Sequence, residues 1–184
     1  MSQAVVINHN SNAAITATLW SNDQTVALLT FKVAGQRHGL LVADVVRIIE
    51  MVAITPLAAA PDIIQGVINL HGKVVPVMDL HQRFGLPAPD YGLHTPIILV
   101  NAGQTQIMGL IVEAVEQVLE VSAGEIEPVD SIVSAELAER MAVNSVYLIG
   151  IAKINRQLIS ILNVQRLLRS TEQAELSQLL SDGN

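Results

Sequence analysis

The stretch Gly66–Phe84, GVINLHGKVVPVMDLHQRF, decides how the rest of the chain is interpreted. Two runs of apolar residues separated by the step His71–Gly72 are typical of a β-hairpin. Gly72 suits the turn, because glycine adopts positive φ without a steric clash of a Cβ atom. Pro76 lies inside the second run and cannot donate a ladder hydrogen bond, so we expect its position to be an edge or a bulge.

The hairpin pattern occurs a second time in the chain. Residues Gly150–Leu168, GIAKINRQLISILNVQRLL, align with it without a gap, and Val77 falls on Ile161. A further pair of similar segments, Leu28–Met51 and Ile98–Val121, precedes the two hairpins in the same order. The aligned positions in that pair include Gly39 with Gly109, Val45 with Val115, and Ile48 with Val118. Two similar blocks that occur twice in the same order indicate an internal duplication.

The composition favours an aliphatic core and argues against nucleic-acid binding. Of the 184 residues, 51% are hydrophobic but only 3% are aromatic, so the core must be built from valine, isoleucine and leucine. The few aromatic residues and the net charge of −7 disfavour a nucleic-acid partner, whose recognition relies on base stacking and basic contacts. Cysteine is absent, so the chain has no disulfide framework, thiol nucleophile or thiolate metal site.

A proline-rich segment after Phe84, GLPAPDYGLHTP, marks a connector between two similar units. The expected parts are a flexible N-terminal tail at 1–24, one domain at 25–169 with repeats at about 25–86 and 96–169, and a C-terminal helix and tail at 170–184. Ser170 and Gln173 fit a capping box for that helix, and Ser134–Met141 look helical within an insertion of the second unit. The sequence shows neither a signal peptide nor an apolar run approaching the roughly 18 residues of a membrane span, so we expect a cytoplasmic protein.

No pattern of catalytic or metal-binding residues stands out. The chain contains no HExxH, GxSxG, GxxxxGK[ST] or GxGxxG motif. His71 and His81 could approach each other across the hairpin, but two histidines alone make a weak case for a metal site. We therefore expect no enzymatic activity, no cofactor and no metal, and a function that the protein exerts through its surface.

The hairpin stretch resembles the signature of CheW-like chemotaxis coupling proteins, whose usual form is G-V-x-N-L-R-G-x-x-x-P-[VI]-x-D-L-R. The resemblance extends from about Leu28 to Leu168, which is nearly the whole chain apart from its two tails. It implies an all-β fold of two five-stranded, OB-like β-barrels with elements exchanged between them. It also implies a non-enzymatic adaptor that joins the cytoplasmic tips of chemoreceptors to the regulatory domain of the histidine kinase CheA, with no direct insertion into the membrane.

In this family the receptor contact lies in an apolar groove between the barrels. Carried over by position, the contact with receptor or kinase would involve Val45, Gly66, His71, Val115 and Val118, with Arg47 beside them. Each residue also has a purely structural interpretation. The three valines could belong to the core, and Gly66 could serve only the backbone conformation at the start of a strand. Asp79 is expected to cap or tie a local turn instead of contacting a partner.

Two positions depart from the family pattern. His71 stands where the family usually has arginine, and Arg47 stands where many members have glutamate in a V-x-E-I pattern. Both replacements change charge on or beside the expected partner surface. They suggest an adaptor for a specialised chemosensory system, such as one that controls surface motility or a second messenger.

The alternative hypotheses come from other functional classes. The first is an OB-like module that binds a ligand or nucleic acid, which the charge and the scarcity of aromatic residues disfavour. The second is an enzyme, which the missing motifs disfavour.

Overall fold

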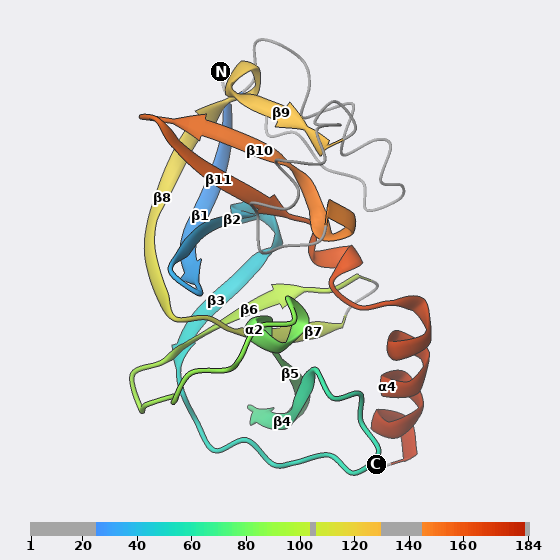
Figure 1. The fold of residues 1–184 in the computed structure, drawn as a ribbon. Helices are drawn as coiled ribbons and strands as arrows, with labels where there is room; N and C mark the ends of the chain where they lie inside the picture. Colours follow the sequence, from blue (N-terminus) through green and yellow to red (C-terminus); the bar gives the residue numbers. More distant parts are fainter. Residues whose placement is uncertain (1–24, 104–105, 130–144, 183–184) are drawn as a thin grey trace.

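The computed structural model describes residues 25–103, 106–129 and 145–182. The strands form two β-sheets, one above the other in Figure 1, and the C-terminal helix lies beside the lower sheet. The expected N-terminal tail at 1–24 and the expected helix at Ser134–Met141 lie outside the described residues.

Sheet A, the upper sheet in Figure 1, has six strands in the order β8-β1-β2-β11-β10-β9. Their bounds are β1 (Thr25–Val33), β2 (Gln36–Leu41), β8 (Ala114–Ser122), β9 (Ile126–Pro128), β10 (Leu148–Ile154) and β11 (Gln157–Leu162). Sheet B, below it, has the order β3-β6-β7-β5-β4. Its strands are β3 (Val45–Glu50), β4 (Ile64–Leu70), β5 (Lys73–Asp79), β6 (Pro96–Asn101) and β7 (Ile107–Ile111).

Helical turns connect or follow the strands. The described α-helices are α2 (Leu80–Arg83) and α4 (Ser170–Asp182), and the described 3-10 turns are Val42–Asp44, Ala123–Glu125, Ser145–Tyr147 and Val164–Arg166. The all-β prediction is therefore confirmed. It was wrong in detail, because sheet A has a sixth strand, β9, added at the edge of β10, and both sheets end in edge strands instead of closing into barrels.

The exchange of elements between the two units is reciprocal. In sheet A, β1 and β2 of the first unit pair with β8 and β11 of the second unit. In sheet B, β6 and β7 of the second unit pair with β3 and β5 of the first. Sheet A therefore contains two strands of the first unit and four of the second, and sheet B contains two strands of the second unit and three of the first. The duplication and the family resemblance predicted such an exchange.

The two glycines aligned by the repeat, Gly39 and Gly109, lie where the units join. Gly39 pairs with Ile161 in the parallel ladder of sheet A, and Gly109 pairs with Val77 in that of sheet B. A Cβ atom on Gly109 would lie 2.9 Å from a methyl group of Ile97, so a side chain there would push neighbouring strands apart. Val77 and Ile161 are both buried, which confirms their equivalence.

The two hairpins have the same turn geometry. His71 and Gly72 both have positive φ, of 51° and 83°, and Asn155 and Arg156 have φ values of 49° and 64°. Two consecutive residues with positive φ define the type I′ turn, whose twist matches that of the flanking strands. Gly72 thus has the positive φ that such a turn requires. Arg156 holds the equivalent position in the second hairpin without the freedom of glycine.

Pro76 lies in a strand that has neighbours on both sides, which differs from the expected edge or bulge. It stands opposite Val67, whose own N–H and C=O groups bond to Thr55 on the other side of β4. The nitrogen of Pro76 therefore faces β7, and the ladder between β5 and β7 begins only at Val77. At Pro76 the strand β5 is paired on the β4 side only, so the missing N–H removes no hydrogen bond from the ladder between β5 and β7.

Asp79 caps the short helix α2, as expected. Its carboxylate accepts a hydrogen bond from the backbone N–H of His81 at 2.8 Å. Asn163, the equivalent residue of the second unit, accepts from the N–H of Gln165 at 3.0 Å. Asx side chains at such positions satisfy N–H groups that have no partner in the first turn.

The start of α4 differs from the expected capping box of Ser170 and Gln173. The carboxylate of Glu172 accepts a hydrogen bond from the backbone N–H of Arg169 at 2.7 Å, so the capping contact lies one residue earlier. Leu176 is fully buried in the main core cluster, and Leu180 packs against that cluster. The helix is held mainly by this apolar face.

The main core cluster lies between the two sheets and is largely aliphatic. It includes Phe31 and Leu40 from sheet A together with Ile98 and Met108 from sheet B. Smaller clusters fill the outer part of each sheet, one around Ile159 and the other around residues such as Val77. The sheets are therefore joined by apolar packing as well as by exchanged strands.

Candidate functional site

The surface formed by β3 and β8 carries four of the residues expected to contact a partner. These strands are the free edges of sheets B and A, hold equivalent places in the two repeats, and lie on the left-hand side of Figure 1. Val45 and Val115 lie at the β-bulges of their strands, are half-buried, and pack against the main core cluster. Arg47 and Val118 are exposed. The two half-buried valines thus combine a packing role with a surface position.

Two further apolar residues belong to this surface and were missed from the sequence. Val46 and Ile48, both on β3, are each 43% exposed, and Val118 on β8 is 56% exposed. Ile48 and Val118 are equivalent in the repeat, so their alignment could have indicated that both face solvent. We define the β3–β8 surface as Val45, Val46, Arg47, Ile48, Val115 and Val118.

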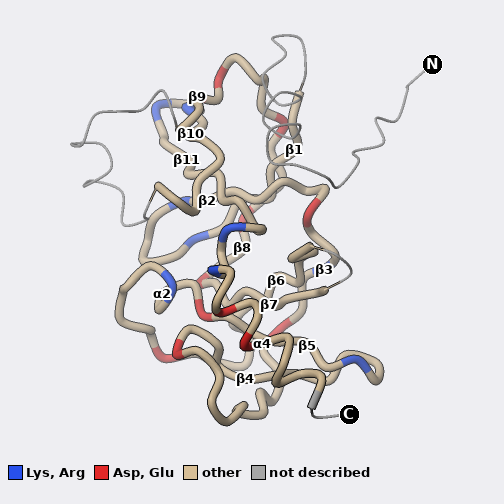
Figure 2. The backbone as a smooth tube through the Cα atoms, turned by 90° about the vertical axis from the view of Figure 1, so that its right-hand side faces the viewer, with Lys and Arg blue, Asp and Glu red and all other residues tan. Residues whose placement is uncertain are grey.

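One charged group near Val118 is neutralised within the protein. Glu116 on β8 pairs with Arg37 at 2.5 Å and with Lys32 at 3.4 Å. The hydrogen bond from Arg37 lowers the pKa of Glu116 below its usual value, so this carboxylate stays ionised. Figure 2 shows basic and acidic positions scattered over both parts of the fold. Among its six residues the β3–β8 surface has Arg47 as its cation, and the exposed Glu50 and Glu120 lie farther along the same two strands.

Gly66 and His71 lie apart from the β3–β8 surface. They belong to β4 and the β4–β5 turn, and β4 is the opposite edge of sheet B from β3. His71 is exposed, as expected for a turn residue. Gly66 is buried with φ of 145°, and a Cβ atom there would lie 2.2 Å from the carbonyl oxygen of Thr55. The structure thus gives Gly66 a conformational role, since no other residue fits this close approach.

A polar cluster connects the two sheets next to β8. Nε2 of His81 in α2 lies 2.8 Å from the carboxylate of Glu113, which also accepts hydrogen bonds from the N–H groups of Ala34 and Gly35 at 2.7 and 3.1 Å. Nδ1 of His81 lies 3.3 Å from the hydroxyl of Tyr91. His81 stands at the last arginine of the family pattern, a departure that the same motif comparison could have found. We call Ala34, Gly35, His81 and Glu113 the His81–Glu113 cluster.

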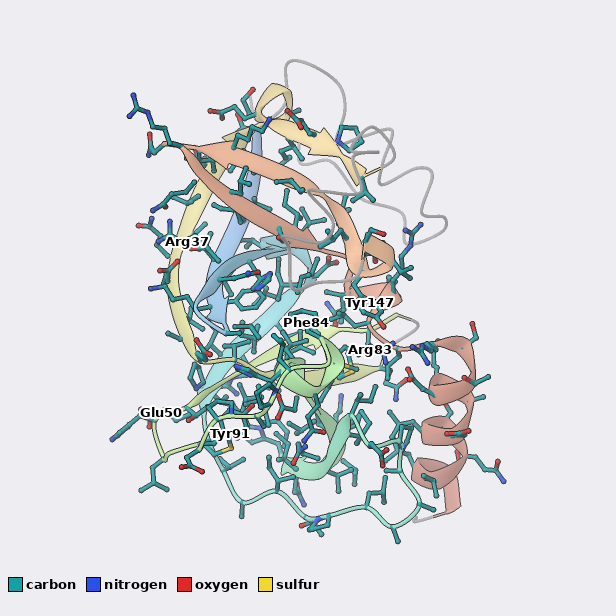
Figure 3. The ribbon with its side chains drawn as sticks, viewed as in Figure 1. Arg37, Glu50, Arg83, Phe84, Tyr91 and Tyr147 are labelled. Atoms are coloured by element: carbon teal, nitrogen blue, oxygen red, sulfur yellow. The ribbon has the colours of Figure 1, made fainter. Side chains whose placement is uncertain are left out.

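The aromatic side chains of the described residues also gather at the junction of the sheets. The ring of His38 lies between those of Phe31 and Phe84, at centroid distances of 5.8 and 5.4 Å. Phe84 stacks on Tyr147 at 6.5 Å, and Figure 3 shows both beside Arg83. The Arg83 guanidinium lies 4.6 Å from the centre of the Tyr147 ring.

Arg83 also bonds to Glu172 of α4 at 2.9 Å. It therefore links the junction of the sheets to the C-terminal helix.

The described residues do not form a group of three or more His, Cys, Asp or Glu side chains that could hold a metal ion. His71 and His81 do not meet, because one is exposed in a turn before β5 and the other is buried after it. Among the described residues, no helix is both long and apolar enough to cross a bilayer. What the structure offers is a β scaffold with exposed apolar side chains on two edge strands.

Comparison with known proteins specifies the class further. The model of the CheW-like domain family matches residues 27–172. The "Chemotaxis protein CheW" of Klebsiella aerogenes is 31% identical over 146 residues, which cover 79% of this chain and 83% of the relative. The protein of that name from Treponema pallidum is 24% identical over 163 residues, covering 86% and 91%. The crystal structure of the scaffolding protein TtCheW from Thermoanaerobacter tengcongensis superimposes with a TM-score of 0.70 at 31% identity, covering 81% of this chain and 96% of that one.

The fold and its surfaces define a β-rich scaffold, and the matches fix which kind. The chain belongs to the CheW-like family. The chemotaxis scaffold predicted from the hairpin motif and the duplication is thereby confirmed.

Proposed function

We propose that this chain couples the cytoplasmic tips of chemoreceptors to the regulatory domain of a CheA-type kinase, and that the β3–β8 surface is the part that contacts the receptor. The observation that carries the proposal is the exposure of Val46, Ile48 and Val118 on two edge strands that hold equivalent places. Exposed apolar side chains on unpaired edge strands are typical of surfaces that a partner covers. The site of action is then the cytoplasm, where the receptor tips lie.

The contact fits a helical or extended apolar segment flanked by an acidic group. Apolar side chains from both strands supply the buried area, and Arg47 supplies a planar cation that can hold a carboxylate with two hydrogen bonds. Val45 and Val115 anchor the two strands, because both pack on the main core cluster. In such a contact the charge of Arg47 would contribute to specificity, and the apolar side chains would contribute to affinity.

The binding test uses matched substitutions of two exposed valines. Val118 is 56% exposed on β8, and Val146 is 57% exposed in the turn before β10, which lies at the opposite end of sheet A from β8. We expect Val118→Glu to weaken the binding of a soluble receptor-tip fragment by about 10-fold or more, because it places a charge in an apolar contact. Val146→Glu is the control and should leave receptor affinity within about twofold. Equal losses in both variants, or in neither, would refute this assignment of the contact.

The chain acts in this proposal without chemistry of its own. Added to kinase and receptor, it should raise kinase autophosphorylation, and alone it should show no turnover of nucleotide or phosphoester. Radiolabelled phosphate incorporation into the kinase measures the first expectation. An intrinsic turnover that disappears when one side chain is replaced would overturn the second.

His71 is the basis of the proposal that the system is specialised. It is exposed at the β4–β5 turn, where the family pattern has arginine, and histidine lacks arginine's permanent charge and bidentate fork. We expect His71→Arg to leave affinity for the cognate receptor tip unchanged and to improve affinity for a more acidic tip. Unchanged affinity for both tips would show that His71 touches neither.

A further inference from the structure

Glu113 stands where the chain crosses from sheet B to sheet A. Strand β7 ends at Ile111 and β8 begins at Ala114, so Val112 and Glu113 alone make the crossing. The backbone N–H of Glu113 donates to the carbonyl of Lys32 on β1 at 2.9 Å. The position of this one residue therefore sets where β8 begins.

The side chain of Glu113 binds groups from both sheets. Its two oxygens accept the N–H groups of Ala34 and Gly35, in the β1–β2 turn of sheet A, at 2.7 and 3.1 Å. The same carboxylate lies 2.8 Å from Nε2 of His81, which follows β5 of sheet B. His81 is buried, and the carboxylate of Asp79 holds its backbone N–H. The crossing is thus fixed to a turn on one side and to a buried ring on the other.

The hydrogen bonds of this cluster favour the ionised form of Glu113. Partial burial acts to raise its pKa, but the bonds from Gly35, His81 and Ala34 lower the pKa below its usual value. Burial, with the nearby Asp79 carboxylate adding to it, raises the pKa of Tyr91, so the hydroxyl beside Nδ1 of His81 stays protonated. Around neutral pH the cluster therefore holds a charged acceptor in a fixed place.

We propose that Glu113 and His81 are positioning residues for receptor binding: by fixing the start of β8 against both sheets, they set the position of the β3–β8 surface. Val115 lies two residues after Glu113, and Val118 lies on the same strand. Neither Glu113 nor His81 needs to touch the receptor. This inference rests on the proposed function, since it takes the β3–β8 surface as the receptor contact.

Glu113→Gln is the sharpest test, because it keeps the shape of the side chain. The amide nitrogen cannot accept a hydrogen bond, so one of the two turn N–H groups loses its bond to the side chain at position 113. Glu175→Gln on the exposed side of α4 removes the same charge away from the β3–β8 surface and is the matched control. Binding of a receptor-tip fragment and of the kinase regulatory domain is measured for both variants, with methyl NMR spectra of Val115 and Val118.

We expect Glu113→Gln to weaken receptor binding by about 10-fold, the effect of losing a charge-assisted hydrogen bond, while kinase binding stays within about twofold. The methyl signals of Val115 and Val118 should shift in Glu113→Gln and stay in place in Glu175→Gln. Receptor affinity equal to wild type, or equal losses for receptor and kinase, would overturn the inference, the second because it would show general destabilisation.

Two further outcomes are decided by the same measurements. If Glu113→Gln does not fold, His81→Gln, which alters the cluster from its other side, is compared with Glu175→Gln by the same criteria. If the wild type does not bind the receptor fragment, the proposed function fails. In that case unmoved methyl signals in Glu113→Gln would overturn the positioning role as well, and shifted ones would support it.

Discussion

His38 should make the stability of this protein depend on pH in a range where most side chains do not titrate. Its ring is 1% exposed and lies between the rings of Phe31 and Phe84. The backbone of Val33 favours the charged ring but offsets the effect of burial only in part. Burial lowers the pKa of His38 from 6.5 to about 4 in the folded protein, because the charged ring would lose its hydration.

The size of the effect follows from the difference between the folded and unfolded pKa values. A histidine with a lowered folded pKa binds a proton more readily when unfolded, so stability is lost as pH falls below the unfolded value of 6.5. At about pH 5 the unfolded ring is almost fully protonated, while about a tenth of the folded rings are. Proton binding at about pH 5 therefore shifts the equilibrium toward the unfolded state by a factor of about 30. This factor corresponds to a loss of about 2 kcal/mol in the free energy of unfolding between about pH 7.5 and pH 5.

The measurement is the free energy of unfolding from urea titrations of the wild type and His38→Phe at both pH values. Phenylalanine keeps an aromatic ring between its neighbours and cannot titrate. The larger side chain costs some stability through overpacking, so the quantity compared is the change between the two pH values in each protein. His94→Gln is the control, because His94 is an exposed histidine. Glu113 and Glu116, whose pKa values are lowered, stay ionised at about pH 5 and contribute little to the change.

We expect the pH-dependent loss to shrink by about 2 kcal/mol in His38→Phe and to change by less than about 0.5 kcal/mol in His94→Gln. A loss in His38→Phe as large as in the wild type would show that the buried ring is protonated in the folded state. The burial argument would then be refuted.

Three further predictions concern the repeated architecture. Arg156→Gly should raise the free energy of unfolding by about 0.5–1 kcal/mol in chemical denaturation, because φ there is 64° in a type I′ turn; a loss would contradict the strain argument. Val77→Ala and Ile161→Ala should each cost about 1–4 kcal/mol through lost burial and a cavity, and a cost below about 0.5 kcal/mol at both sites would contradict their equivalence. Gly66→Ala should cost more than about 3 kcal/mol in thermal or chemical unfolding, while Gly92→Ala, which meets no atom within 4 Å, should be nearly neutral; similar values for the two would remove the steric explanation.

Most of the fold could be predicted from local patterns in the sequence. The hairpin was recognisable because its apolar runs and its turn glycine lie within a few residues of each other, and its second copy revealed the duplication. The sixth strand of sheet A was missed because β9 is a three-residue segment without its own periodicity. The interior position of Pro76 could not be foreseen either. It depends on where β7 begins to pair, which is set by residues far along the chain.

The candidate site was predicted only in part, for the same physical reason. Val45 and Val118 could be placed on one surface through the repeat and the family resemblance. Gly66 lies elsewhere, because a motif that is continuous in sequence runs from one edge of a sheet to its interior. His81 and Glu113 are 32 positions apart and meet only through the tertiary fold. No spacing rule connects two such residues, so their contact needed the structure.

The reciprocal exchange of strands has a consequence for how the chain can be divided. Neither repeat contains all the strands of one sheet. In sheet A, β1 and β2 pair with β8 and β11 of the other repeat, and in sheet B, β6 and β7 pair with β3 and β5. Fragments cut in the connector should therefore be unfolded alone and recover the native state when mixed. The same geometry is that of a two-fold symmetric homodimer whose identical subunits swap strands, joined end to end by one peptide segment. Gene fusion of such a dimer would turn its symmetric interface into the core of a monomer. The sequences of the two equivalent edge strands, β3 and β8, could then diverge.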